Sequence, residues 1–217
     1  MSQIKNLADL RREYIQPEFN KKVAHKDPIQ QFEKWFEEIT KVGVEDANAM
    51  TLATSSPDGT PSARIVLLKG VEEGNFVFFT NYQSDKGGDM DKNPKVCLNF
   101  YWPQLSRQVK INGIAERIEE SKSVVYFQSR PRESQIGAWA SPQSAPIADR
   151  KILEQRFEEM TEKFKSRENI DKPKQWGGYA VVPYSIEFWQ GRPNRLHDRL
   201  LYVLDENNHW KIQRLAP

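Results

Sequence analysis

Hydrophobic residues recur with the spacing of a helix in an early part of the 217-residue chain. The positions concerned are Ile29, Phe32, Phe36 and Ile39. Because residues three or four apart share one face of a helix, this run predicts a helix that faces the core. Asp27 is placed as its N-cap, with Pro28 at the first helical position and Gln30 completing a capping box. Gly43 is placed to end the helix.

From residue 49 onward the apolar positions change to the alternation of β-strands, and turn-forming residues arrive at short intervals. The predicted strands are residues 49–55, 62–69, 76–81, 95–101, 107–118, 179–189, 199–204 and 209–214. Helices are predicted at residues 121–128 and 147–165, with an irregular stretch between them. Because the short connections suit antiparallel hairpins, we expect a mainly β fold with α-helices, an antiparallel barrel rather than a parallel sheet.

The first 26 residues lack a sustained hydrophobic pattern. Residues 7–14 predict a short basic helix, and residues 17–26 a polar connector. We therefore expect residues 1–26 to form a mobile arm and residues 27–217 a single domain. The arm has no apolar core of a signal peptide, and no apolar run approaches the roughly 18 residues of a transmembrane helix. We expect a protein that does not enter a membrane.

Charge and cysteine content narrow the possible classes of function. The 32 Lys and Arg residues nearly balance the 30 Asp and Glu residues, and the net charge of +2 gives no general field for nucleic acid or an anionic membrane. Any anion site must be local. Cys97 is the single cysteine, so an intramolecular disulfide or a cysteine-rich zinc site is excluded, and we expect a cytoplasmic location.

Two segments place cations beside predicted strands. Arg64 and Lys69 flank an apolar run, and on a regular strand they would lie on opposite faces and serve different ligands. Two solvated cations at strand ends are the alternative. Residues 80–86 follow a strand and precede an expected helix, where hydroxyl groups, backbone N–H groups and Lys86 suit a phosphate. An ordinary polar loop would have the same composition.

A denser group of donors lies at residues 130–139. Two arginines, a serine and a glutamine stand close together behind Tyr126, and this density indicates an anion site. A charged helix end is the alternative. Tyr126 and Arg130 would share a helix face if the helix continued through Arg130, which Pro131 disfavours.

The segment at residues 186–199 contains one of the three histidines among several arginines. Alternation would place Arg195, His197 and Arg199 on one face of an extended segment. Such a row of donors suits a planar, anionic ligand. His25 and His209 are interpreted as ordinary surface or core histidines.

Taken together, these segments resemble the pyridoxine (pyridoxamine) 5′-phosphate oxidase family along nearly the whole chain. The matching motifs are RREY at 11–14, RIVLLK at 64–69, FTN at 79–81, RQV at 107–109, SRPR at 129–132, SQIGAW at 134–139, IEFWQG at 186–191, RLHDR at 195–199 and RLAP at 214–217. The resemblance implies an antiparallel FMN-binding split β-barrel with peripheral helices. It also implies a homodimer whose two flavins lie at the subunit interface.

The resemblance further implies a set of residues that bind FMN. They are Arg64, Ile65, Val66, Leu67, Leu68, Lys69, Phe79, Thr80, Asp85, Lys86, Gln108, Gln143, Ser144, Trp189 and Arg199. A phosphate with nearly two negative charges needs several charge-assisted donors, and the flavin ring needs a donor where charge builds on reduction. Arg199 suits the second task. No metal is expected.

The substrates implied are pyridoxine 5′-phosphate and pyridoxamine 5′-phosphate, oxidised to pyridoxal 5′-phosphate by hydride transfer from C4′ to flavin N5, with O₂ as final acceptor giving H₂O₂. The implied substrate-binding residues are Arg11, Arg12, Glu13, Tyr14, Lys69, Tyr126, Arg130, Ser134, Arg195, Leu196 and His197. Arg195 and His197 would lie over the pyridine ring as catalytic residues. Residues 11–14 would close as a lid that excludes water. Asp46 would supply a carboxylate near the active site.

One position departs from the family pattern. Asp85-Lys86 stands where the family usually has Arg-Lys, and two glycines follow. Asp85 would repel the FMN phosphate unless it turns to solvent and caps the next helix, and we favour the capping role. Two other functions remain open, namely a split-barrel flavin oxidoreductase with another substrate and a protein that binds FMN or pyridoxal phosphate without turnover. A nucleic-acid module fits poorly because charge is balanced.

Overall fold

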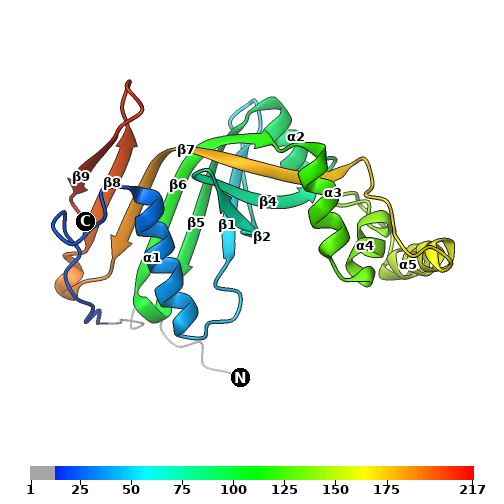
Figure 1. Cartoon of the computed structure of the whole chain (residues 1–217), viewed down its shortest axis with the longest axis horizontal. Coiled ribbons are helices and arrows are strands. Elements are labelled where there is room, and N and C mark those ends of the chain that lie inside the picture. Colours follow the sequence, from blue (N-terminus) through cyan, green and yellow to red (C-terminus); the bar gives the residue numbers. More distant parts are fainter. Residues whose placement is uncertain (1–12) are drawn as a thin grey trace. The chain divides into compact units, whose positions relative to one another are not determined.

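The computed structural model describes residues 13–217 as nine strands joined in one sheet, with helices around them (Figure 1). Hydrogen-bonded neighbours follow the order β2-β1-β5-β6-β7-β4-β3, with β8 added to β7 and β9 to β8. The strands are β1 Ala49–Ser55, β2 Pro61–Leu67, β3 Gly70–Glu72, β4 Asn75–Asn81, β5 Lys95–Trp102, β6 Arg107–Arg117, β7 Trp176–Gln190, β8 Asp198–Leu204 and β9 Trp210–Leu215. The helices are α1 Pro28–Lys41, α2 Asp85–Lys92, α3 Glu120–Ser129, α4 Arg132–Ala140 and α5 Arg150–Phe164, with short 3₁₀ turns at Pro103–Leu105 and Pro193–Arg195.

The chain divides into two compact units whose segments alternate along the sequence. The first unit contains the described residues up to Ala47, together with Asn99–Ile111 and Tyr184–Pro217. The second unit contains Asn48–Leu98 and Asn112–Pro183. Strands β5, β6 and β7 each contribute residues to both units. The single domain at residues 27–217 stays a prediction.

Helix α1 builds the core of the first unit. The Asp27 side chain accepts the Ile29 N–H at 2.8 Å, and Pro28 begins the helix, as predicted. The predicted role of Gln30 is wrong, because the side chain that reaches back is Gln31, which accepts the His25 N–H at 3.0 Å. Trp35, which the helical pattern did not single out, is 2% exposed in this core.

Aromatic rings fill the core of the first unit beneath α1. Phe32 packs against Phe100 with ring centroids 5.1 Å apart, and Trp35 packs edge-on against Phe188 at 5.2 Å. Large aromatic side chains remove much apolar surface from water and favour such tilted and edge-to-face contacts. Tyr202, also fully buried, donates its hydroxyl proton to the His25 carbonyl oxygen at 2.7 Å. These contacts join α1 to strands of the same unit.

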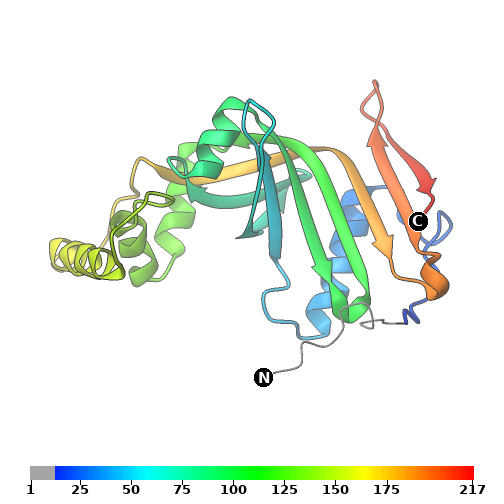
Figure 2. The ribbon, with the colours of Figure 1, turned by 180° about the vertical axis from the view of Figure 1, so that it is seen from behind.

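The second unit combines antiparallel strand pairs with the helices α2, α3, α4 and α5. The β1–β2 hairpin pairs Ala49 with Leu67 through to Ser55 with Pro61, and β4 pairs with β7 from Phe76–Val181 to Asn81–Trp176. Helices α3, α4 and α5 gather at the Trp176 end of β7, as the two opposite views show (Figures 1 and 2). Their shared core consists of Phe127, Ile136, Phe164, Ile170 and Trp176.

Two elements were not expected from the sequence. The stretch between α3 and α5 is not irregular, because α4 occupies Arg132–Ala140. Its first residue anchors it, since the Arg132 guanidinium donates to the carbonyl oxygens of Phe164 at 2.6 Å and Arg167 at 3.0 Å. Strand β2 ends at Leu67 rather than at residue 69, and the short strand β3 follows.

The N-terminal expectations fall largely outside the described residues. The predicted helix at residues 7–14 is covered only by Glu13 and Tyr14, which have no helical structure. Arg11 and Arg12 of the expected lid lie outside the described residues. Within residues 13–217, none of the helices has the length and apolar character needed to cross a membrane.

Candidate functional site

A cavity of about 610 Å³ lies in the second unit. Residues predicted for the cofactor or the substrate line much of it, namely Ile65, Val66, Leu67, Lys69, Phe79, Thr80, Lys86, Tyr126, Arg130, Ser134 and Gln143. Other lining residues were not predicted, namely Asn81, Pro131, Gly137, Ala138, Ser141 and Trp176. Arg64, Leu68, Asp85 and Ser144 lie outside the lining, although all four belong to the same unit. Segments far apart in the sequence therefore share one cavity.

Lys86 brings a buried cation to this cavity. It is 8% exposed, and its Nζ donates to Ser84 Oγ at 3.1 Å and to Gln143 Oε1 at 3.2 Å. Thr80 Oγ1 donates to the same Gln143 oxygen at 3.2 Å. Burial lowers the pKa of Lys86, the charge of Arg64 lowers it further, and Asp85 opposes both. Since both acceptors of Lys86 are neutral, an anion in the cavity would stabilise the charged amine.

Arg64 lies beside this cluster on β2. Its Nη1 donates to Thr54 Oγ1 at 2.7 Å, and its Nη2 donates to Ser62 Oγ at 2.6 Å. Burial lowers the pKa of Arg64, while the charges of Asp89 and Asp85 raise it. The guanidinium is therefore oriented by hydroxyl groups of the β1–β2 hairpin. The expected separation of Arg64 and Lys69 on two faces of one strand does not apply, because β2 ends at Leu67.

The structure corrects the expected role of Asp85. The N-cap of α2 is Ser84, and Asp85 is the first helical residue. Its backbone N–H donates to Ser144 Oγ at 3.3 Å. The negative charge of Asp85 acts on both Arg64 and Lys86 and opposes the lowering of their pKa by burial.

Three stacked rings form an apolar part of the cavity wall. Phe79 and Tyr126 stack with centroids 3.9 Å apart, and the Trp176 ring lies nearly parallel to both, 5.4 Å from Phe79 and 6.1 Å from Tyr126. Gly178 makes room for this arrangement, because a Cβ there would lie 2.8 Å from the Phe79 ring. The guanidinium carbon of Arg130 lies 4.7 Å from the Trp176 ring centroid. This wall offers a flat ring both stacking surfaces and a nearby cation.

Arg130 carries an unsatisfied nitrogen. Its Nη1 is buried and has no hydrogen-bond partner among residues 13–217. Burial lowers the pKa of Arg130, and Tyr126 opposes this. Leaving a charged donor buried and unpaired costs free energy on the order of 1–3 kcal/mol or more, so native proteins rarely do so without a ligand. An anion that accepts from Nη1 would remove this cost.

Arg130 lies in the short junction between helices α3 and α4. Helix α3 ends at Ser129, as the effect of Pro131 favours, so Arg130 does not share a helix face with Tyr126. Its backbone is extended, and Pro131 leads directly into α4. Buried Gln135 fixes this junction by donating to the carbonyl oxygens of Gln128 at 3.2 Å and Arg130 at 2.9 Å. Both Tyr126 and Arg130 nevertheless line the cavity.

A second group of predicted residues lies in the first unit. Tyr14, Trp189 and His197 contact one another, with ring centroids 5.7 Å apart for Tyr14–Trp189, 5.4 Å for Tyr14–His197 and 4.7 Å for Trp189–His197. Gly191 admits the Tyr14 ring, because a Cβ at Gly191 would lie 2.6 Å from it. Tyr14 of the expected lid therefore contacts one residue predicted to bind FMN, Trp189, and one predicted to bind the substrate, His197.

His197 has a defined ring orientation. Its Nδ1 accepts the Arg192 N–H at 3.1 Å, so the neutral ring carries its proton on Nε2. Burial and the charge of Arg195 lower the pKa of His197, and Asp198 opposes them. The expected row of Arg195, His197 and Arg199 on one extended face is wrong. Arg195 lies in a 3₁₀ turn with a left-handed φ of 62° and is exposed.

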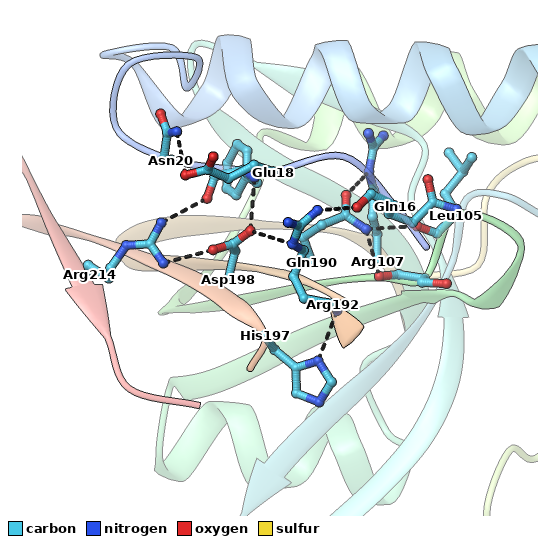
Figure 3. A network of polar contacts seen from close by, with 12 residues as sticks. Gln16, Glu18, Asn20, Leu105, Arg107, Gln190, Arg192, His197, Asp198 and Arg214 are labelled. Carbon is cyan, nitrogen blue, oxygen red and sulfur yellow. Dashed lines mark hydrogen bonds and ion pairs between the residues drawn. The ribbon is translucent and has the colours of Figure 1, made fainter. Parts of the chain in front are cut away.

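A buried carboxylate holds the start of β8 (Figure 3). Asp198 is 5% exposed and accepts from Arg214 Nη1 at 2.7 Å and from the Phe19 N–H at 3.0 Å. It also forms an ion pair with Arg192 at 3.4 Å. Because Asp198 directly follows His197, these contacts fix the backbone on which the imidazole stands.

Arg199 is also held by a buried carboxylate, that of Glu187. Its Nε donates to Glu187 Oε1 at 2.7 Å, and its Nη1 donates to the Ala216 carbonyl oxygen at 2.9 Å. Glu187, 4% exposed, also pairs with Lys110 at 2.7 Å. Burial raises the pKa of Glu187, but the hydrogen bonds from Arg199 and Lys110 outweigh it and lower the pKa overall.

The remaining predicted residues of the first unit are half-buried or exposed, or lie in a turn. Gln108 lies on β6 and is half-buried, whereas Glu13 is exposed and Leu196 is 70% exposed. Asp46 lies in the turn between α1 and β1 with a left-handed φ of 52°.

Comparisons with known proteins agree on one family. Residues 36–164 match the model described as "Pyridoxamine 5'-phosphate oxidase", and residues 176–217 match that of a "Pyridoxine 5'-phosphate oxidase C-terminal dimerisation region". The chain is 49% identical over 213 residues to the pyridoxine/pyridoxamine 5′-phosphate oxidase of Trichormus variabilis, covering 98% of this chain and 99% of that one. It is 52% identical over 213 residues to the protein of the same name from Rubrobacter xylanophilus, covering 98% and 97%.

Solved structures agree on the fold. PhzG from Burkholderia lata 383, solved in complex with tetrahydrophenazine-1-carboxylic acid, is 27% identical with a TM-score of 0.86, covering 93% of this chain and 98% of that one. A pyridoxamine 5′-phosphate oxidase-related, FMN binding protein from Nostoc punctiforme has a TM-score of 0.71 at 17% identity, covering 88% and 98%. The predicted split-barrel fold and the resemblance carried by the motifs are both confirmed.

Proposed function

Because the chain belongs to the pyridoxamine 5′-phosphate oxidase family, we propose that it is an FMN-dependent oxidase that converts pyridoxine 5′-phosphate and pyridoxamine 5′-phosphate to pyridoxal 5′-phosphate. The family uses FMN. The observation that carries the proposal is the buried, unpaired Nη1 of Arg130 in the cavity that Lys86 also lines. FMN and the substrate each bring a phosphate, and the cavity offers two sets of cationic donors.

The residues present fit FMN. Buried Lys86, with Thr80 and Gln143, would hold its phosphate, and Arg64 would add a second positive charge beside them. We assign the flavin ring to the backbone and side chains of residues 65–69 and to Gln108, Trp189 and Arg199. Ser144 and Asp85 border the phosphate site. When bound, FMN supplies a hydride acceptor at N5 and passes the electrons to O₂, giving H₂O₂.

Four side chains of the same cavity would bind the substrate phosphate, namely Lys69, Tyr126, Arg130 and Ser134. Arg130 supplies the guanidinium whose Nη1 needs an acceptor, and Tyr126 and Ser134 supply hydroxyl donors. Fixing the phosphate positions the remote C4′ atom, since binding energy far from the reacting carbon orients the substrate.

Arg195 and His197 would lie over the pyridine ring. His197 presents Nε2–H as a donor because Nδ1 is occupied by the Arg192 N–H. Its lowered pKa keeps the ring neutral near pH 7, so it donates without adding positive charge. Tyr14, seated on Trp189 and His197, would shield the ring from water together with residues 11–13 and Leu196.

We also propose a homodimer whose sites are completed across the interface. The match of residues 176–217 to a dimerisation region supports it. A single cysteine, Cys97, supports a cytoplasmic location. The dimer is testable by light scattering, where a monomer would contradict it.

The decisive test compares phosphorylated with dephosphorylated substrates. Wild-type protein should form pyridoxal 5′-phosphate and H₂O₂ from both phosphorylated substrates. Arg130→Ala should raise KM for pyridoxamine 5′-phosphate by roughly ten- to hundredfold, the value of a charged hydrogen bond, and leave any oxidation of pyridoxamine unchanged. Wild-type protein that oxidises neither substrate, or an Arg130→Ala variant with unaltered KM, would refute the proposal. The likeness to PhzG makes an anionic substrate without a phosphate the alternative, and the comparison of phosphorylated with dephosphorylated substrates distinguishes the two.

A further inference from the structure

Helix α2 carries Lys86 and is intrinsically weak. It is eight residues long, and two of them are glycines, which disfavour helices. Gly87 is required by packing, because a Cβ there would lie 2.1 Å from the Tyr82 carbonyl oxygen. Its N-cap residue, Ser84, makes no capping hydrogen bond with its side chain. The orientation of Lys86 must therefore depend on contacts between α2 and the sheet.

One such contact runs from α2 to the β1–β2 hairpin. Thr54 on β1 is 3% exposed and donates its hydroxyl proton to Asp89 Oδ2 at 2.7 Å. The same hydroxyl oxygen accepts from Arg64 Nη1 at 2.7 Å. A threonine hydroxyl has one proton to donate, so its direction is set: the proton goes to Asp89 and a lone pair faces Arg64. We call this the Arg64–Thr54–Asp89 relay.

The relay links the two cations beside the cavity. Arg64 stands at one end of it, and Asp89 at the other end lies three residues after Lys86, on the same helix. Arg64 and Lys86 are close enough for the charge of one to act on the other. Two neighbouring cations repel each other, so they keep one geometry only if other groups hold them. A doubly charged phosphate would then meet donors that need no rearrangement.

We propose that Thr54 and Asp89 are positioning residues for the FMN phosphate: the relay holds α2 at Asp89, and with it Lys86, in register with Arg64. The inference rests on the proposed function, because it takes FMN as the phosphate that these cations bind. Neither Thr54 nor Asp89 lines the cavity, so they act through Arg64 and Lys86.

The test removes the hydroxyl group without changing the shape of the side chain. Thr54→Val can neither donate to Asp89 nor accept from Arg64, whereas Thr54→Ser keeps both abilities and is the matched control. Apoprotein of each is titrated with FMN and with riboflavin, which has the same ring but no phosphate, and binding is followed by quenching of flavin fluorescence. Thr54→Val should bind FMN about tenfold more weakly and riboflavin as the wild type does. Thr54→Ser should match the wild type with both ligands.

A second pair of variants changes Asp89, the half-buried partner of Thr54. These variants still test the inference if Thr54→Val does not fold. Asp89→Asn keeps an oxygen that accepts from Thr54 and removes the negative charge, whereas Asp89→Ala removes both. Asp89→Asn should bind FMN at least as tightly as the wild type, and Asp89→Ala about tenfold more weakly.

The outcomes separate the two claims. Equal losses for FMN and riboflavin, or no loss for FMN, would make the relay purely structural and overturn the inference, even though FMN binds. Equal FMN affinities in Asp89→Asn and Asp89→Ala would overturn it too. Wild-type apoprotein that does not bind FMN would refute the proposed function, and the inference with it.

Discussion

The position that departs from the family pattern gives the sharpest electrostatic prediction. Asp85 is exposed, begins α2, and acts on both Arg64 and Lys86. Asp85→Arg should therefore tighten FMN binding, because it replaces a charge that repels a phosphate with one that attracts it. Asp85→Asn removes the repulsion alone and is the matched control.

The size of the gain follows from the exposure of the side chain. Exposed charge pairs contribute about 0.2–1 kcal/mol each. Reversing the charge at Asp85 removes one unfavourable term and adds one favourable term, so the gain is about 0.4–2 kcal/mol. At 1.4 kcal/mol per factor of ten, FMN affinity should rise roughly two- to thirtyfold in Asp85→Arg, and about half as far on a logarithmic scale in Asp85→Asn.

The assay is a titration of apoprotein with FMN at low and at high salt. Screening should shrink the gain as salt rises, because the interaction is exposed. Riboflavin should bind all three proteins equally, since it lacks the phosphate. Unchanged or weaker FMN binding in Asp85→Arg at low salt would refute the reasoning, and a gain that persists at high salt would show that it is not electrostatic.

Two further predictions concern stability. Gly88→Ala should raise the free energy of unfolding by about 0.5–1 kcal/mol, because nothing lies within 4 Å of a Cβ there, whereas Gly87→Ala should lower it through the clash with Tyr82; equal thermal shifts in both variants would contradict this. Glu187→Gln should lose stability at pH 7, and the deficit should shrink as pH falls below 4.5. The folded-state pKa of Glu187 is lowered, so its contribution is complete above the ordinary value and is lost on protonation. A deficit that stays constant down to pH 3 in urea titrations would count against it.

Local pattern predicted the strands well where alternation and turn residues agreed. Residues 49–55 are β1 as predicted. Helix α4 was missed because Pro131 and Gly137 obscure its pattern, and its anchor is a tertiary contact from Arg132 to carbonyl groups at the end of α5. The alternation rule failed at Arg195 because it assumes extended backbone, whereas that residue adopts a left-handed φ.

Site residues that stand in sequence motifs were predicted, whereas a residue that reaches the site only through strand pairing was missed. Lys86, Tyr126 and Arg130 stand in recognisable segments and line one cavity. Trp176 also lines it and was not singled out. It is paired with Asn81 across the β4–β7 register, and no local pattern reveals which residues two distant strands will pair. The capping role predicted for Asp85 is wrong by one residue, since Ser84 is the N-cap and Asp85 is the first residue of the helix.

Anaerobic mixing of the FMN-loaded protein with pyridoxine 5′-phosphate tests the central claim most directly. An oxidase should lose the visible flavin absorption band as the substrate is converted to pyridoxal 5′-phosphate, and admission of O₂ should restore the band with one equivalent of H₂O₂. A flavin band that stays unchanged on anaerobic addition of both pyridoxine 5′-phosphate and pyridoxamine 5′-phosphate would contradict the proposed activity.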